Sequence, residues 1–236
     1  MLYRKLLKHN NLTPYKIRIK ESNILIYCKK PIKRKAKRYL KEARTQIEDY
    51  INLHPQFEIS PRPLKLDIKA PSIIKSMLKA SKSADVGPMA SVAGAIAGYI
   101  GHKLLSDSGE VMVENGGDIF LKSSRERIIG VYAGRSLLSE KIAIRLPILS
   151  KPYGVCTSSG TVGHSFSYGE ADAVVIISNS CPYSDAWATK IANMIKKDSD
   201  IKKALKIIRK NPKILGGLII KGGKLAVIGN IAIKNI

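Results

Sequence analysis

The chain has 236 residues, of which 44% are hydrophobic and 25% charged, so it can bury a large core and is not mainly disordered. Its formal net charge of +23 is unevenly divided, with +15 on residues 1–82, −1 on residues 83–195 and +9 on residues 196–236. The nearly neutral middle section, residues 83–195, holds most of the polar motifs, so charge and candidate chemistry are segregated along the chain.

The first 53 residues predict an α+β beginning. Charged residues interrupt residues 1–10, which therefore do not form a secretory signal, and we expect a cytoplasmic protein. Strands are predicted at residues 16–20 and 23–28, on either side of a turn. A helix follows from Lys33 to Leu53, because its apolar residues repeat at alternating spacings of four and three.

Lysines and arginines occupy the outward faces of this helix. They predict a solvated basic face, with electrostatic attraction to a nucleic acid or another polyanion as the alternative. No aromatic RNA-binding motif, zinc-finger spacing or helix-turn-helix pattern accompanies the charge, so we expect no specific nucleic-acid partner. Prolines then mark a boundary that divides the chain into a basic N-terminal section, residues 1–70, and a core, residues 71–236.

The core opens with a short amphipathic helix around Ile73 to Leu78. Small residues then fill the run from Gly87 to Gly98, which predicts a helix that another backbone or a flat ligand can approach closely. The longer stretch from Val86 to Gly101 is too short and too rich in glycine, alanine and serine for a membrane span. No membrane partner is therefore expected.

Two short apolar runs flank Asn115-Gly116-Gly117, which predicts a tight hairpin turn. Further strands are predicted at residues 128–132, 142–146 and 173–177, and a C-terminal hairpin turns at Gly222-Gly223. The predicted strands and helices follow one another without a repeating βαβ pattern. The predicted fold class is α+β, with a mostly antiparallel sheet and packed helices.

Asp185 and Thr189 lie four residues apart in a segment, Ser184 to Asn193, that predicts a buried helix. Positions i and i+4 share one helical face, so the carboxylate and the hydroxyl can point at the same object. Oxygen ligands of this kind suit Mg²⁺, which usually binds together with a phosphate group of the substrate. The alternative is structural: Asp185 interacts with the helix dipole from the first turn, and Thr189 packs.

The three cysteines, Cys28, Cys156 and Cys181, lack the paired spacing of a zinc site or a disulfide framework, so we expect thiols. Cys156 directly precedes a Thr-Ser-Ser-Gly turn, and Cys181 lies four residues before Asp185. A thiolate at either position could be a catalytic nucleophile or carry sulfur as a persulfide. Alternatively, both cysteines fill space in the core.

Four segments follow one another in a fixed order over residues 85–195. They are the small-residue helix, Glu114 to Asp118, Thr157 to Gly160 with the downstream His164, and Ser184 to Thr189. Together they resemble the ApbE family, the FAD:protein FMN transferases, in a divergent archaeal or anaerobic branch. The resemblance implies an ApbE-like, two-lobed single unit.

The resemblance also implies a site for FAD or FMN with Mg²⁺ at the diphosphate. It assigns Asp185 and Thr189 to the metal, together with a backbone carbonyl between Ala90 and Ala93. Asp118 or His164 would accept a proton from the attacking hydroxyl of a cytoplasmic acceptor protein. The nucleotide would be bound by the two turns, at Asn115, Gly116, Gly117, Thr157, Ser158, Ser159 and Gly160.

Two departures from the family pattern leave other functions open. After His164 the chain reads Ser-Phe-Ser-Tyr-Gly-Glu where the family has Asp-Pro-x-Thr-Gly, and we expect no export signal. The main hypothesis is a Mg²⁺-dependent ApbE-like protein that transfers FMN or hydrolyses FAD. The alternatives are a cytoplasmic sulfur-handling protein that uses Cys156 and Cys181, and a module that binds flavin without turnover. The sequence leaves the oligomeric state open.

Overall fold

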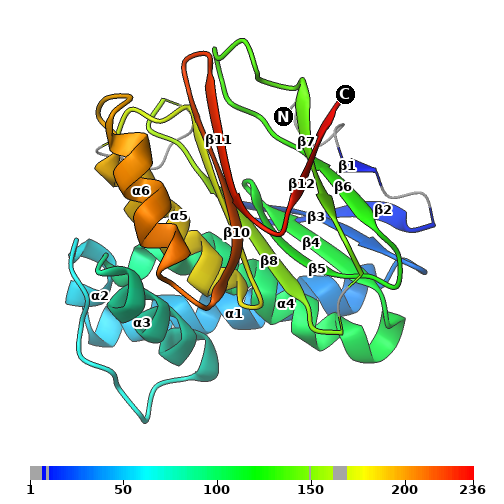
Figure 1. Ribbon diagram of the computed structural model, residues 1–236. Coiled ribbons are helices and arrows are strands. Elements are labelled where there is room, and N and C mark those ends of the chain that lie inside the picture. Colours follow the sequence, from blue (N-terminus) through cyan, green and yellow to red (C-terminus); the bar gives the residue numbers. More distant parts are fainter. Residues whose placement is uncertain (1–6, 9–10, 149, 162–168) are drawn as a thin grey trace.

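Two antiparallel sheets and a layer of helices make up the fold (Figure 1). The structure is a computed structural model that describes residues 7–8, 11–148, 150–161 and 169–236. The larger sheet has eight strands in the order β11-β10-β9-β8-β5-β4-β3-β2, and the smaller has four in the order β1-β6-β7-β12. Every strand pair among the described residues is antiparallel, and the predicted fold class, α+β with mostly antiparallel sheet, is confirmed.

The strands of the larger sheet have these bounds: β2 Thr13–Ile19, β3 Ser22–Cys28, β4 Val111–Asn115, β5 Asp118–Lys122, β8 Tyr153–Ser158, β9 Ala173–Ser178, β10 Ile214–Lys221 and β11 Lys224–Gly229. Those of the smaller sheet are β1 Leu7–Lys8, β6 Arg127–Gly130, β7 Ile142–Leu146 and β12 Ala232–Asn235. The helices are α1 Lys33–Leu53, α2 Gln56–Ile59, α3 Ser72–Ala84, α4 Val92–Ser108, α5 Cys181–Met194 and α6 Asp200–Arg209, with a 3₁₀ turn, η2, over Pro88–Ser91.

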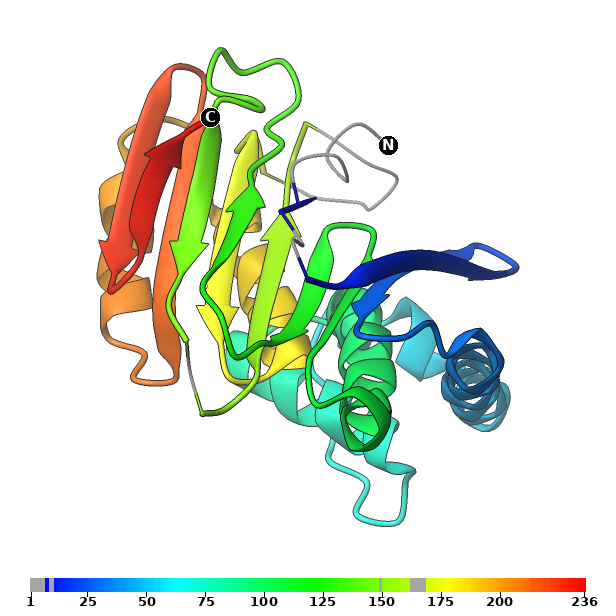
Figure 2. The ribbon, with the colours of Figure 1, turned by 90° about the vertical axis from the view of Figure 1, so that its right-hand side faces the viewer.

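The larger sheet separates two apolar layers, because successive side chains along a strand point to opposite faces. On β3, Ile24 and Ile26 pack against the helices, whereas Leu25 and Tyr27 lie in the layer shared with the smaller sheet. Figure 2 shows the smaller sheet lying over one face of the larger sheet and the helices over the other. The inner strands β4, β5, β8 and β9 are therefore buried on both faces over most of their length.

The predicted helix over residues 33–53 and the strand over residues 142–146 have the predicted bounds. The predicted Thr157–Gly160 turn is wrong at its start, because Thr157 and Ser158 form the end of β8. Neither β8 nor α6 was predicted. Residues on both sides of the expected boundary at residue 70 share one apolar cluster, in which Leu40 of α1 contacts the same core as Ile74 of α3.

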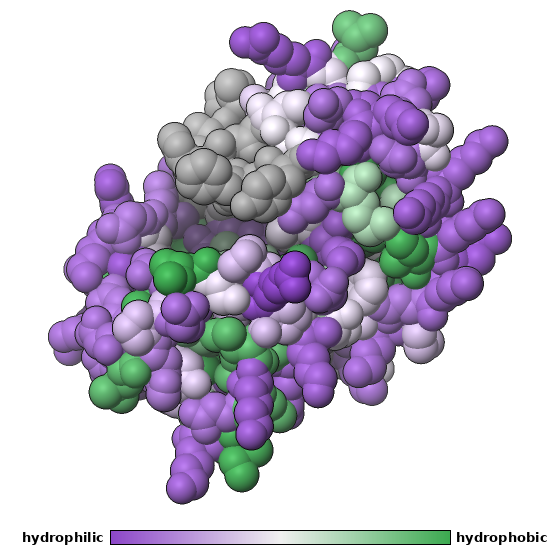
Figure 3. All heavy atoms as spheres, turned by 90° about the vertical axis from the view of Figure 1, so that its left-hand side faces the viewer, coloured by the Kyte–Doolittle hydropathy of each residue, from purple (hydrophilic) through white to green (hydrophobic). Residues whose placement is uncertain are grey.

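The surface is largely polar and charged. The outward face of α1 exposes Lys33, Arg34, Lys37 and Lys41, in agreement with the predicted basic face. Hydrophilic side chains also cover most of the face shown in Figure 3, and the hydrophobic patches between them are small. Among the described helices, none has the length and apolar content that crossing a membrane requires.

Candidate functional site

A cavity of about 1010 Å³ opens between the two sheets and the helix layer. Its inner part is apolar and is lined from both sheets, for example by Ile129 and Ile144 on one side and Val155 and Val175 on the other. Its polar part lies where η2, the β4–β5 hairpin, the end of β8 and α5 meet. The fold therefore places an apolar compartment, large enough for a planar ring system, next to a cluster of oxygen-bearing side chains.

Most of the predicted site residues reach this cavity although they are distant in sequence. The lining includes Asn115, Gly116, Gly117, Asp118, Thr157, Ser158, Ser159, Asp185 and Thr189. Cys156, Cys181 and Gly160 do not line it. His164 lies outside the described residues, so its predicted role stays a prediction.

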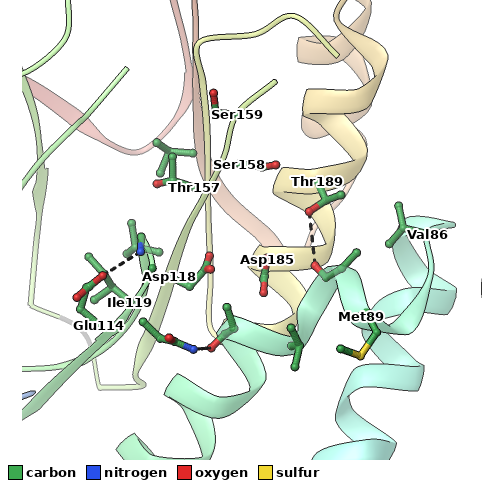
Figure 4. Close-up of a pocket in the computed structure, with 18 of the residues that line it drawn as sticks. Val86, Met89, Glu114, Asp118, Ile119, Thr157, Ser158, Ser159, Asp185 and Thr189 are labelled. Carbon is green, nitrogen blue, oxygen red and sulfur yellow. Dashed lines mark hydrogen bonds between the residues drawn. The ribbon is translucent and has the colours of Figure 1, made fainter. Parts of the chain in front are cut away.

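Asp185 and Thr189 lie on the face of α5 that packs on the start of α4, as Figure 4 shows. Asp185 Oδ2 accepts a hydrogen bond of 2.8 Å from the Gly94 amide. The Thr189 hydroxyl donates to the Ala90 carbonyl at 3.5 Å. A carboxylate, a hydroxyl and a backbone carbonyl thus converge. The first turn of α5 has no acidic residue, so the structural alternative for Asp185, a first-turn interaction with the helix dipole, is wrong.

Two buried carboxyl groups face each other across the polar part of the cavity. Asp118 is 6% exposed and Asp185 9%. Burial raises the pKa of Asp185 to about 7, against the opposing effect of the hydrogen bond from Gly94. Burial, followed by the negative charge of Asp185, also raises the pKa of Asp118 well above its ordinary range. Among the described residues, Asp118 Oδ1 has no hydrogen-bond partner.

The aspartate, glutamate, lysine and arginine positions of the described lining are all acidic. They are Glu58, Glu114, Asp118 and Asp185, and no lysine or arginine is among these residues. A bare diphosphate would therefore be repelled, whereas a divalent cation would find hard oxygen donors. The described residues contain no cluster of three or more histidine, cysteine, aspartate or glutamate side chains placed to hold a metal. The donor set thus fits a hard cation such as Mg²⁺ that shares its coordination with a phosphate.

The β4–β5 hairpin presents Asp118 to the cavity through a tight turn. Gly116 and Gly117 have φ angles of +67° and +107°, which favour glycine, and they place Asn115 opposite Asp118 in the register. Glu114 Oε1 accepts a hydrogen bond of 2.9 Å from the Gly117 amide. No role was predicted for Glu114, although its position directly before the turn was a usable signal.

The loop after β8 gives a more limited phosphate site than predicted. Ser158 and Ser159 line the cavity. The Gly160 amide already donates a hydrogen bond of 2.8 Å to the Ala171 carbonyl, so it is not available to a phosphate in this conformation. The Thr161 amide likewise donates to Ser159 Oγ at 3.0 Å.

The cysteine pair lies behind the cavity wall. The sulfur atoms of Cys156 and Cys181 are 3.6 Å apart, and the Cys156 thiol donates to the Cys181 carbonyl at 3.2 Å. The two residues are 0% and 2% exposed, and burial raises the pKa of both thiols. The geometry favours packing over thiolate chemistry, so it does not support the sulfur-handling alternative.

Glycines on α4 let α5 approach closely, which gives a matched pair of substitutions. A Cβ at Gly94 would lie 2.7 Å from the Cys181 carbonyl oxygen and 2.8 Å from Asp185 Cβ, whereas one at Gly98 would have ordinary contacts at 3.4 Å or more. We expect Gly94→Ala to destabilise the protein by about 1–3 kcal/mol through overpacking. We expect Gly98→Ala to stabilise it by about 0.5–1 kcal/mol through helix propensity. Urea unfolding measures both, and a stabilising Gly94→Ala would contradict the packing described.

The fold has counterparts among solved structures. The flavin transferase ApbE from Vibrio cholerae aligns with a TM-score of 0.57 over 94% of this chain and 97% of that chain, at 11% identity. The flavinyl transferase ApbE from Pseudomonas stutzeri, in its apo form, aligns with a TM-score of 0.59 over 94% of each chain, at 12% identity. The chain thus has the fold of these ApbE structures.

Sequence comparison gives the family. The sequence model of the family described as "AbpE bacteria" matches residues 4–211, and the chain belongs to this family. It is 41% identical over 222 residues to a UPF0280 protein of Methanococcus maripaludis, covering 92% of this chain and 90% of the relative. It is 40% identical over 222 residues, with the same coverage, to a UPF0280 protein of Methanocaldococcus jannaschii. The predicted resemblance to a divergent archaeal ApbE-like branch is confirmed.

Proposed function

We propose that the protein binds FAD with Mg²⁺ in this cavity and cleaves its diphosphate, so that FMN passes to an acceptor hydroxyl and AMP leaves. The observation that carries the proposal is the convergence of the Asp185 carboxylate, the Thr189 hydroxyl and the Ala90 carbonyl beside Asp118. The names of the solved relatives, flavin transferase and flavinyl transferase, support flavin as the substrate class.

Asp185, Thr189 and the Ala90 carbonyl would hold the Mg²⁺ ion, which supplies charge neutralisation at the diphosphate. The acidic lining makes this neutralisation necessary, because it offers no lysine or arginine among the described residues. The apolar compartment between the sheets has room for a planar ring system. Ser158 and Ser159 would contribute hydrogen bonds to phosphate oxygens from the end of β8.

The reaction requires a group that accepts the proton of the attacking hydroxyl. Asp118 is suited to it because its Oδ1 has no hydrogen-bond partner among the described residues and because burial raises its pKa, which makes the carboxylate more basic. His164 is the second candidate, from sequence alone. In the balanced step the acceptor oxygen bonds to the FMN phosphorus, the diphosphate P–O bond breaks, and AMP takes the bond's electrons. A serine or threonine of a cytoplasmic protein would give transfer, and water would give hydrolysis.

The test is to incubate the purified protein with FAD and either Mg²⁺ or EDTA and to identify the products by mass spectrometry. We expect AMP to appear only with Mg²⁺, together with free FMN or a protein carrying FMN. FAD that stays bound but intact would favour the flavin-binding module without turnover. Absence of both binding and products would overturn the proposal.

A further inference from the structure

The polar part of the site is assembled from three separate segments. Asp118 comes from the β4–β5 hairpin, the Ala90 carbonyl from η2, and Asp185 with Thr189 from α5. These segments are up to about a hundred residues apart in sequence, so their relative placement depends on the contacts between them. A metal site requires its donors to be held close to their working positions before the ion arrives.

Three side-chain hydrogen bonds connect these segments. Two of them join α5 to the η2–α4 region: the Thr189 hydroxyl donates to the Ala90 carbonyl, and the Gly94 amide donates to Asp185. The third joins the β4–β5 hairpin to the first turn of α4, where Asn115 Nδ2 donates to the Ala93 carbonyl at 3.0 Å. Ala93, whose carbonyl accepts the bond from Asn115, and Gly94, whose amide donates to Asp185, are neighbours in sequence. The start of α4 is therefore held between the two elements that carry the carboxylates.

We propose that Asn115 is a positioning residue of the metal site, which sets the Ala90–Ala93 segment against Asp118 and Asp185 rather than binding the nucleotide. This inference rests on the proposed function and changes the role predicted for Asn115. The Asn115 amide group is already used inside the protein, and it lies at the last residue of β4, one turn from Asp118. Without its donor, the hairpin loses its bonded link to the carbonyls of the η2–α4 junction.

The chain offers a matched control for this hydrogen bond. Asn179 Nδ2 donates to the Pro152 carbonyl at 3.1 Å, so it makes the same kind of bond at nearly the same length. Asn179 does not line the cavity. Asn115→Ala and Asn179→Ala thus each remove one amide-to-carbonyl hydrogen bond, half-buried at Asn115 and exposed at Asn179, which contributes up to about 1 kcal/mol to stability. Only the first is expected to affect the site.

The experiment measures Mg²⁺ binding to the protein alone by titration calorimetry, FAD binding separately by fluorescence, and the thermal unfolding midpoint of each variant. We expect Asn115→Ala to bind Mg²⁺ about 10-fold more weakly, in the range found when outer groups that orient metal ligands are removed. Asn179→Ala should match the wild type in Mg²⁺ affinity. Neither variant should unfold at the temperature of the binding measurements, and Asn179→Ala, whose hydrogen bond is exposed, should lower the unfolding midpoint by no more than Asn115→Ala.

Asn115→Asp is the second variant, and it separates positioning from charge. It removes the donor but adds a negative charge close to the cation, which by Coulomb attraction alone would strengthen Mg²⁺ binding. Weaker binding in this variant supports positioning. Unchanged or stronger Mg²⁺ binding in both Asn115 variants would overturn the inference. Wild-type protein that binds Mg²⁺ but not FAD would overturn the proposed function alone. Wild-type protein that binds no Mg²⁺ without FAD but releases AMP from FAD with Mg²⁺ would overturn this inference alone.

Discussion

Asp185→Asn is expected to slow the Mg²⁺-dependent cleavage of FAD strongly while leaving the protein folded. Asparagine keeps the size of the side chain and an oxygen that can accept the hydrogen bond from Gly94, but it removes the charge that a divalent cation requires. The loss of several kcal/mol of charge stabilisation corresponds to a rate decrease of about 100–1000-fold. Release of AMP from FAD, followed by mass spectrometry, measures it.

The same substitution is expected to stabilise the protein when no metal is present. Burial raises the pKa of Asp185 from its ordinary value near 3.8 to about 7, so the folded state favours the protonated carboxyl. That favourable contribution is fully present below the unfolded pKa and is lost as the pH rises through about 7. With EDTA at pH 8, the thermal midpoint of Asp185→Asn should therefore exceed that of the wild type. In the wild type, Mg²⁺ affinity should fall as the pH drops below about 7, because a proton competes for the carboxylate.

Asp198→Asn is the control for both effects, because Asp198 is exposed and lies outside the cavity. It should leave AMP release unchanged and should lower the stability of the metal-free protein at pH 8 by at most about 1 kcal/mol, through loss of its exposed ion pair with Lys224. Full activity of Asp185→Asn would remove Asp185 from the metal site. Equal stability of the wild type and Asp185→Asn at pH 8 would instead show that the buried carboxylate is compensated in another way.

The location of the site could be predicted from the sequence because the patterns that define it are local. The spacing of Asp185 and Thr189 predicts a shared helical face, and the small residues of α4 predict a close approach, which the structure shows to be that of α5. The turn at Gly116-Gly117 likewise follows from residues that favour positive φ. In each case the cause and the effect lie within a few residues of one another.

What the sequence did not reveal depends on contacts between distant segments. Strand β8 was not predicted because Gly154 interrupts its pattern, and that glycine is required by packing: a Cβ there would lie 2.4 Å from Cys181 Cα. The carbonyl of Ala90 and the anchoring bond of Asn115 involve partners 99 and 22 residues away. Helix α6 is different, because the spacing of Ile201, Ala204 and Ile208 was a readable amphipathic signal.

A buried ion pair outside the cavity joins the two sheets that enclose it. Glu110 lies directly before β4, and Arg127 begins β6. Arg127 Nη2 donates to Glu110 Oε2 at 3.3 Å, and Ser123 Oγ and the Ser124 amide donate to the same oxygen at 3.0 and 3.1 Å. Burial would raise the pKa of Glu110, but the hydrogen bonds of Ser124 and Ser123 and the charge of Arg127 lower it to about 2. The side chains of Glu110 and Arg127 are only 7% and 4% exposed.

Glu110→Gln is expected to lower the free energy of unfolding by about 3–5 kcal/mol, because the buried guanidinium of Arg127 loses its carboxylate. The wild-type contribution of Glu110 is present above its ordinary pKa of 4.5 and is lost as the pH falls toward about 2, so the two proteins should converge in acid. Urea unfolding at pH 7 and pH 3 tests this, with the exposed Lys224–Asp198 pair as a control worth at most about 1 kcal/mol. Neither residue of the buried pair lines the cavity, so Glu110→Gln should retain FAD cleavage well below its unfolding temperature and lose it at a lower temperature than the wild type. A loss of cleavage in the fully folded variant would show that the relative placement of the two sheets, and not stability alone, determines the geometry of the site.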